Sequence, residues 1–255
     1  MAVTALGTIG LLFLVLPIVA LLIRSLQTRA WERMPESAIP DAIWLSFLST
    51  SITIVLIAIF GTPLAYILTR RKFPLKRLAT VLVELPIVLP PAVAGLALLI
   101  TFGRRGLLGP ALGEIGIALP FSFAAVVLAQ TFVAAPFYIR SAQIGFHSIP
   151  IEIEEAARVD GAGGVRLFWW IIFPIARRAL AAGLVLSWAR ALGEFGATIL
   201  FAGSLQGRTQ TMPLLIYNIF ERDIDAAIWT GLMLVVIALV ALLLSHWLAR
   251  NAKEN

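Results

Sequence analysis

Six apolar runs of bilayer-spanning length constrain this sequence more than any other feature. They cover residues 5–23, 43–68, 81–102, 121–144, 179–201 and 229–248. A helix needs about 20 apolar residues to cross the hydrocarbon core of a membrane. Only 13% of the residues are charged, against about 25% in ordinary soluble domains. We therefore predict an all-α integral membrane protein with six transmembrane helices that form a single domain over residues 1–255.

The basic residues between these runs predict the orientation of the chain. With both termini inside, twelve of them fall on the cytoplasmic side: Arg70, Arg71, Lys72, Lys76, Arg77, Arg140, Arg158, Arg166, Arg177, Arg178, Arg250 and Lys253. Seven fall on the opposite side: Arg24, Arg29, Arg33, Arg104, Arg105, Arg208 and Arg222. Cytoplasmic loops carry the excess of Lys and Arg in membrane proteins. We therefore expect a multi-pass cell-membrane protein with cytoplasmic N- and C-termini.

The chain contains no cysteine, which limits the catalytic groups and metal ligands that it offers. The chain offers no thiol as nucleophile or metal ligand, and it has only two histidines. The phosphate-binding P-loop pattern, Gly-x4-Gly-Lys-Ser/Thr, does not occur. We therefore expect no metal, no cofactor and no nucleotide site, and no enzymatic activity in this chain. The net charge of +6 does not indicate nucleic acid, because the basic residues border apolar runs, as they do at a membrane face.

A polar segment at residues 150–174 separates the fourth run from the fifth. Pro150 suits the first turn of a helix, where a missing N–H costs nothing. The helix that follows carries Glu152, Glu154, Glu155, Ala156 and Ala157. The acidic residues favour the positive end of the helix dipole, the small alanines permit close approach of another surface, and Gly161 allows the chain to turn. The segment is thus either an amphipathic helix on the bilayer or a cytoplasmic helix that docks on a soluble partner.

The pattern Glu155-Ala156-Ala157-x3-Gly161-x9-Ile171-x2-Pro174 resembles the EAA motif of ABC-importer permeases. Its spacing agrees throughout, and the one departure is Phe173, where that family usually has Leu. The resemblance implies the type I ABC importer permease fold, with a cytoplasmic coupling helix between spans four and five that docks on an ATP-binding subunit. The residues that it assigns to coupling are Glu154, Glu155, Ala156, Ala157, Gly161, Ile171 and Pro174.

Prolines and a charge pair interrupt the apolar runs at two further places. Pro90 and Pro91 remove backbone donors and predict a bend in the third span, which is either a packing kink or backbone that faces a cavity. Arg190 and Glu194 lie four residues apart in the fifth run. We expect them to pair, because a lone charge there costs roughly 2.5–3.5 kcal/mol. Such a pair either supports a gate or is a structural ion pair.

A second resemblance concerns the substrate. The runs that carry it are Leu85–Pro91, Gly103–Gly106, Arg190–Thr198 and Gly207–Leu214. Together they resemble the molybdate/tungstate branch of the molybdate–sulfate permeases. The run Gly-Glu-Phe-Gly-Ala-Thr at residues 193–198, followed by Thr-Gln-Thr-Met-Pro-Leu at residues 209–214, favours molybdate over sulfate within that family.

The second resemblance implies a permease subunit of an ATP-driven importer for molybdate or tungstate. The partners that it implies are two copies of an ABC ATP-binding subunit, an extracytoplasmic molybdate/tungstate-binding protein and a second copy of this chain, all within or against membrane lipid. The residues expected at the translocation path or its gate are Pro90, Pro91, Arg190, Glu194, Phe195 and Thr198. A sulfate or thiosulfate permease and a secondary transporter are the alternatives.

Overall fold

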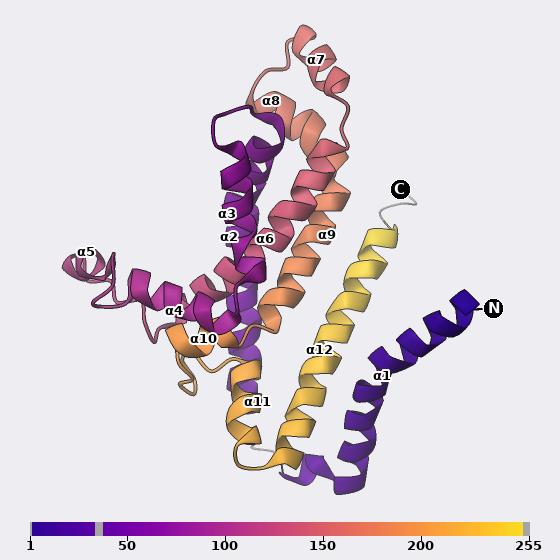
Figure 1. Cartoon of the computed structure of the whole chain (residues 1–255), viewed down its shortest axis with the longest axis vertical. Helices are drawn as coiled ribbons and strands as arrows, with labels where there is room; N and C mark the ends of the chain where they lie inside the picture. Colours follow the sequence, from indigo (N-terminus) through magenta and orange to yellow (C-terminus); the bar gives the residue numbers. More distant parts are fainter. Residues whose placement is uncertain (1, 34–37, 252–255) are drawn as a thin grey trace.

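The computed structural model describes residues 2–33 and 38–251, and within these ranges all regular structure is helical (Figure 1). The long helices are α1 (Ala2–Thr28), α2 (Ile39–Arg70), α6 (Phe123–His147), α9 (Phe173–Leu192) and α12 (Ile224–Asn251). The short elements are η1 (Ala30–Arg33), α3 (Lys76–Val88), α4 (Pro91–Phe102), α5 (Gly109–Glu114), α7 (Ile151–Val159), α8 (Val165–Leu167), the π-helical turn η2 (Phe168–Ile172), α10 (Gly196–Phe201) and α11 (Met212–Phe220). The all-α prediction is confirmed.

The described helices provide five or six membrane spans, against six predicted, and the predicted third span is not straight. Five helical stretches of the described chain are long and apolar enough to cross a bilayer: α1, α2, α6, α12 and the continuous stretch from α8 to α9. The pair α3 and α4, bent by 117°, is a broken span or a re-entrant loop, and the total is six when the pair is counted as one span. The third span was predicted over residues 81–102 with a bend at its prolines, and in the structure two separate helices cover that run.

The break between α3 and α4 follows from two consecutive prolines. Leu89 and Pro90 each precede a proline, and such residues are driven out of the helical region into an extended conformation. Their ψ angles are 131° and 134°. Pro91 then begins α4 at a position where no N–H is required. The predicted bend is thus present as a complete interruption of the helix.

The fifth predicted span also ends early. Helix α9 stops at Leu192, whereas residues 179–201 were predicted to be continuous. After Gly193 the carboxylate of Glu194 accepts a hydrogen bond of 2.7 Å from the backbone N–H of Ala197. This bond satisfies an N–H group at the start of α10 that has no partner within the helix, so a new short helix begins and the apolar run turns.

Helices α2, α6 and α9 pack side by side and form the core of the molecule. Hydrogen bonds of 2.8 Å from Ser141 Oγ to the Ala179 carbonyl, and of 3.0 Å from Ser187 Oγ to the Ala134 carbonyl, join α6 to α9. An ideal Cβ on Gly145 would lie 2.5 Å from the Cβ of Ala179. Small residues and polar groups of this kind hold membrane helices together where no hydrophobic force acts between them.

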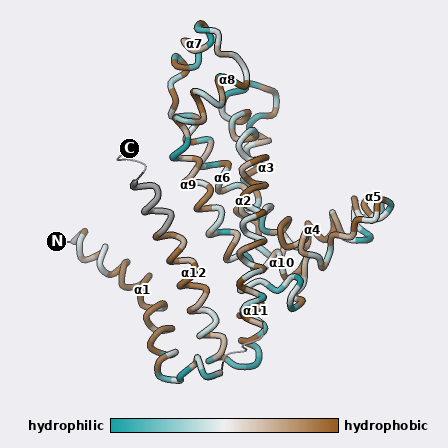
Figure 2. The backbone as a smooth tube through the Cα atoms, turned by 180° about the vertical axis from the view of Figure 1, so that it is seen from behind, coloured by the Kyte–Doolittle hydropathy of each residue, from teal (hydrophilic) through white to brown (hydrophobic). Residues whose placement is uncertain are grey.

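Helix α1 stands at the edge of the molecule. It contacts α12 and η1, and the most apolar 18-residue window of this helix contains no buried residue. Figure 2 shows hydrophobic colouring along both α1 and α12. In Figure 1 the C-terminal end of α1 and the N-terminal end of α12 lie at the bottom of the molecule, opposite α7 at the top. Exposed apolar surface of this extent requires lipid or another chain to cover it.

Candidate functional site

Helix α7 projects beyond the bundle at the top of Figure 1, between the ends of α6 and α8. Its side chains divide into two faces. Glu155 and Ala156 are exposed, together with the apolar Ile151 and Ile153. Ala157 points inward and belongs to the core cluster that also contains residues of α2, α6 and α9. The exposed face is therefore free to meet another surface, while the inner face is attached to the bundle.

Glu154 lies on the inner face, which the sequence did not reveal. Its side chain is 1% exposed, and its Oε1 lies 2.7 Å from Nε of Arg70 at the end of α2. Arg70 also donates a hydrogen bond of 2.7 Å from Nη2 to the carbonyl of Ile149. The guanidinium of Arg158 lies 3.9 Å from the second carboxylate oxygen. Glu154 thus anchors α7 to the bundle and does not face outward with Glu155.

Arg70 is a residue that sequence reasoning missed. It lies in the basic run Arg70-Arg71-Lys72, which predicted only the orientation of the chain. Nothing in the sequence distinguishes Arg70 from its neighbours, because its partner lies 84 positions further along, at Glu154. The structure assigns it a positioning role: it ties the second span to the segment between the fourth and fifth spans.

The return from α7 to the membrane depends on glycine. Gly161 has φ of +86° and Gly164 has φ of +54°, backbone conformations in which a Cβ would be strained. Between them the N–H of Ala162 donates a hydrogen bond of 2.8 Å to the carbonyl of Ala157. Ile171 is half-buried within η2, and Pro174 is exposed in the first turn of α9. The predicted turn at Gly161 is confirmed.

The second group of predicted residues lies where the two broken spans meet. Helices α4 and α10 lie in direct contact. A Cβ on Gly95 would lie 2.7 Å from the carbonyl oxygen of Ala197, and a Cβ on Gly196 would lie 2.5 Å from the Cβ of Pro91. The breaks near Pro91 and Gly196 are therefore brought side by side, which the sequence alone did not show.

The expected ion pair is present at this junction. Arg190 Nη2 lies 2.7 Å from Oε2 of Glu194, whose side chain is 1% exposed, against 28% for that of Arg190. The other carboxylate oxygen accepts from the backbone N–H of Ala197. Both oxygens of Glu194 are thus satisfied within one chain. The pair spans the end of α9 and the start of α10, and does not lie inside one continuous helix as predicted.

The remaining predicted path residues differ in exposure. Pro90 is exposed, and Phe195 is half-buried with its ring 5.0 Å from that of Tyr217. Hydrogen bonding with Glu221 and the charge of that carboxylate raise the pKa of Tyr217 above its ordinary value. Thr198 is fully buried, and its hydroxyl has no hydrogen-bond partner among the described residues. In this conformation Thr198 therefore lies behind the surface of any path.

No group of three or more His, Cys, Asp or Glu side chains that could hold a metal ion occurs within residues 2–33 and 38–251. The carboxylates of Glu154 and Glu194 form ion pairs with Arg70 and Arg190, and the hydroxyl of Thr198 has no hydrogen-bond partner among the described residues. The geometry thus offers a projecting helix for docking and a junction of broken helices.

Comparisons with known proteins agree with this arrangement. Residues 61–253 match the family model described as "Binding-protein-dependent transport system inner membrane component". The molybdenum transport system permease protein ModB of Mycobacterium tuberculosis is 41% identical over 234 residues, which cover 92% of this chain and 89% of that protein. The sulfate transport system permease protein CysW of Synechococcus elongatus is 36% identical over 226 residues, covering 88% of this chain and 79% of that protein.

A solved bacterial alginate ABC transporter, crystallised with its alginate-bound periplasmic protein, contains a chain of the same fold. The TM-score is 0.81 over 100% of this chain and 95% of that chain, at 18% sequence identity. This likeness confirms the predicted importer-permease fold. With three quarters of its length matched by the family model and relatives similar along most of the sequence, this chain belongs to the family of binding-protein-dependent transport system inner membrane components.

Proposed function

We propose that this chain is the permease subunit of an ATP-driven importer of molybdate or tungstate. The observation that carries the proposal is the 41% identity to a molybdenum transport permease along 92% of the chain. The projecting helix α7 supports it, because a subunit that conducts passively has no need of such a segment. The chain would form the translocation path, while ATP hydrolysis would take place on a separate subunit.

Helix α7 is the proposed contact with that ATPase. Its exposed face combines the apolar side chains of Ile151 (47% exposed) and Val159 (88% exposed) with the carboxylate of Glu155. An apolar ridge with a charged edge suits a cleft on a soluble protein. The ion pair between Arg70 and Glu154 would transmit a displacement of α7 directly to α2. Gly161, Ile171 and Pro174 would shape the return of the chain to the membrane.

The proposed assembly contains two copies of this chain, two ATPase subunits and an extracytoplasmic binding protein. One chain carries one coupling segment, so a pair of chains would present two. The exposed apolar surface of α1 would be covered by lipid or by the second copy. In this assembly α7 and both termini would face the cytoplasm. Lys253, part of the basic C-terminus used to predict this orientation, lies outside the described residues.

The junction of α4 and α10 is the proposed gate region. Helices broken within a membrane occur where their backbone faces protein or a cavity, and two such breaks meet here at Pro91 and Gly196. Arg190 and Glu194 would hold the junction together, with Pro90 and Phe195 at its surface and Thr198 behind it. Because Arg190 is neutralised by Glu194, a dianion would pass without being trapped, as conduction requires.

Sulfate is the second candidate substrate. The 36% identity to a sulfate permease over 88% of the chain supports it. A secondary transporter is a weaker candidate, because the two charged groups at the junction satisfy each other and leave no free titratable group there.

Reconstitution tests these proposals. The chain is assembled in liposomes with its ATPase and its binding protein, and uptake of molybdate, tungstate, sulfate and phosphate is compared with and without ATP. We expect ATP-dependent uptake of molybdate or tungstate. Sulfate uptake alone would reassign the substrate, and uptake without ATP would refute the importer mechanism. A Glu155→Lys chain serves as the uncoupled control.

A further inference from the structure

A large cavity lies beside the coupling segment and away from the junction of α4 and α10. Its volume is about 1160 Å³, and its walls come from α2, α6, η2 and α9 together with the glycine turn after α7. Pockets for small molecules measure roughly 300–1,000 Å³, so this space is large for a metabolite. None of the residues that line it belongs to the predicted path.

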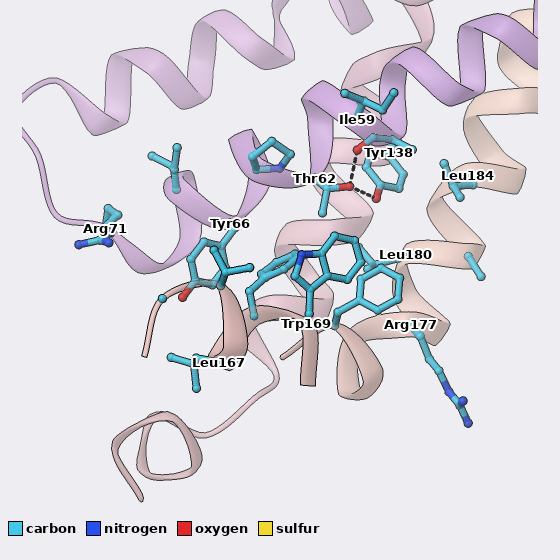
Figure 3. Close-up of a pocket in the computed structure, with 18 of the residues that line it drawn as sticks. Ile59, Thr62, Tyr66, Arg71, Tyr138, Leu167, Trp169, Arg177, Leu180 and Leu184 are labelled. Atoms are coloured by element: carbon cyan, nitrogen blue, oxygen red, sulfur yellow. Dashed lines mark hydrogen bonds between the residues drawn. The ribbon is translucent and has the colours of Figure 1, made fainter. Parts of the chain in front are cut away.

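The lining changes from apolar to cationic along the cavity. Ile59, Leu180 and Leu184 form its deep part, and Arg71, Arg158 and Arg177 also line it. Figure 3 shows Arg71 and Arg177 on opposite sides of the cavity, with the rings of Tyr66 and Trp169 between them. From Ile59 to Arg71 is twelve residues of α2 and its end, which at 1.5 Å per residue is about 18 Å. The cavity therefore runs from membrane depth to the membrane surface.

Two of the three arginines that line the cavity, Arg71 and Arg177, have no counter-ion among the described residues, whereas Arg158 lies 3.9 Å from the carboxylate of Glu154. Within residues 2–33 and 38–251, the side chains of Arg71 and Arg177 form neither an ion pair nor a hydrogen bond. The nearby carboxylate of Glu154 is buried and engaged by Arg70. Guanidinium groups bind phosphate oxygens in bidentate fashion, and Trp and Tyr rings favour the level of lipid head groups. An apolar interior with an uncompensated cationic rim is complementary to an anionic amphiphile.

We propose that this cavity binds one anionic phospholipid from the leaflet on the side of α7. An acyl chain would occupy the space beside Ile59, Leu180 and Leu184, and the phosphate would bind one of the two guanidinium groups, Arg71 on one side of the cavity or Arg177 on the other. The lipid would then contact α2, the turn at Gly163 and Gly164 and the start of α9 together. Its binding would stiffen the attachment of the coupling segment. This inference depends on the membrane location of the chain and not on the transported substrate.

Native mass spectrometry of the purified assembly tests this site. The protein is placed in mixed micelles that contain equal amounts of phosphatidylglycerol and phosphatidylcholine. Bound lipid is then removed in steps, and the lipid that remains on the protein is identified. We expect about a tenfold preference for phosphatidylglycerol, lost in the Arg71→Gln/Arg177→Gln double variant. The matched control is Arg105→Gln, because Arg105 is exposed but remote from this cavity. Equal retention of both lipids, or a preference unchanged in the double variant, would overturn the proposal.

A second arm separates a lipid from a free anion. Ala181→Trp fills the apolar part of the cavity and leaves all three arginines in place. We expect this variant to lose the bound lipid, and inorganic phosphate at millimolar concentration not to displace it from the unmodified chain. Displacement by phosphate, or retention in the filled variant, would show that the arginines bind an anion without the cavity and would contradict the proposal. Equal melting temperatures of all variants confirm that each one is folded.

Discussion

Removing Arg70 is expected to release the coupling helix from the bundle. In the Arg70→Ala variant the carboxylate of Glu154, which is 1% exposed, loses its partner at 2.7 Å, and the carbonyl of Ile149 loses its hydrogen bond. The remaining cation, Arg158, lies 3.9 Å away with a side chain that is 61% exposed, so it compensates weakly. Breaking a buried ion pair by removing one partner costs about 3–5 kcal/mol.

This loss of stability should be confined to residues 150–174, because the Arg70–Glu154 ion pair joins only that segment to the end of α2. A change of about 3 kcal/mol raises the opening equilibrium roughly 100-fold. Hydrogen exchange of residues 150–174 in detergent should therefore accelerate by at least that factor, while exchange in α6 stays constant. The amount of ATPase subunit that co-purifies with the chain should fall as exchange in residues 150–174 accelerates.

The double change Arg70→Met/Glu154→Met provides the decisive comparison. It removes both charges and leaves neither one unpaired, so it should be less damaging than Arg70→Ala alone. A double-mutant cycle of Arg70→Met, Glu154→Met and the double variant, measured as hydrogen exchange of residues 150–174, gives this coupling. Single effects that simply add, or exchange in residues 150–174 that matches the unmodified chain, would refute the reasoning.

Three further predictions concern the other contacts. Arg190→Ala should lower stability and uptake more than Arg190→Ala/Glu194→Ala, since the single change leaves a buried carboxylate without its partner; a cycle on uptake checks this, and additive effects would contradict it. Glu155→Lys should abolish ATP-driven uptake with normal membrane insertion, and unchanged uptake and ATPase co-purification would argue against docking by α7. Gly95→Ala should cost about 1–3 kcal/mol, because its Cβ would lie 2.7 Å from the Ala197 carbonyl, whereas Gly113→Ala meets nothing within 4 Å; equal melting temperatures would exclude close packing at Gly95.

The sequence by itself determined the membrane character and the position of the coupling segment. Both are local properties. A run of about 20 apolar residues favours the bilayer whatever surrounds it, and four of the six predicted runs fall within α1, α2, α6 and α12, except for two residues before the start of α6. Likewise Pro150 and Gly161 bracket α7 as predicted, because proline and glycine act on their own backbone.

Tertiary structure alone decided which face of each element meets which partner. The EAA pattern grouped Glu154 with Glu155, yet Arg70 draws the first inward and leaves the second exposed. The sequence predicted a bend at Pro90 and Pro91 but not its angle of 117°. It also gave no sign that Gly95 and Gly196 would bring the two breaks together. These features depend on contacts between residues far apart in the chain, whose geometry is set by packing and not by local propensity.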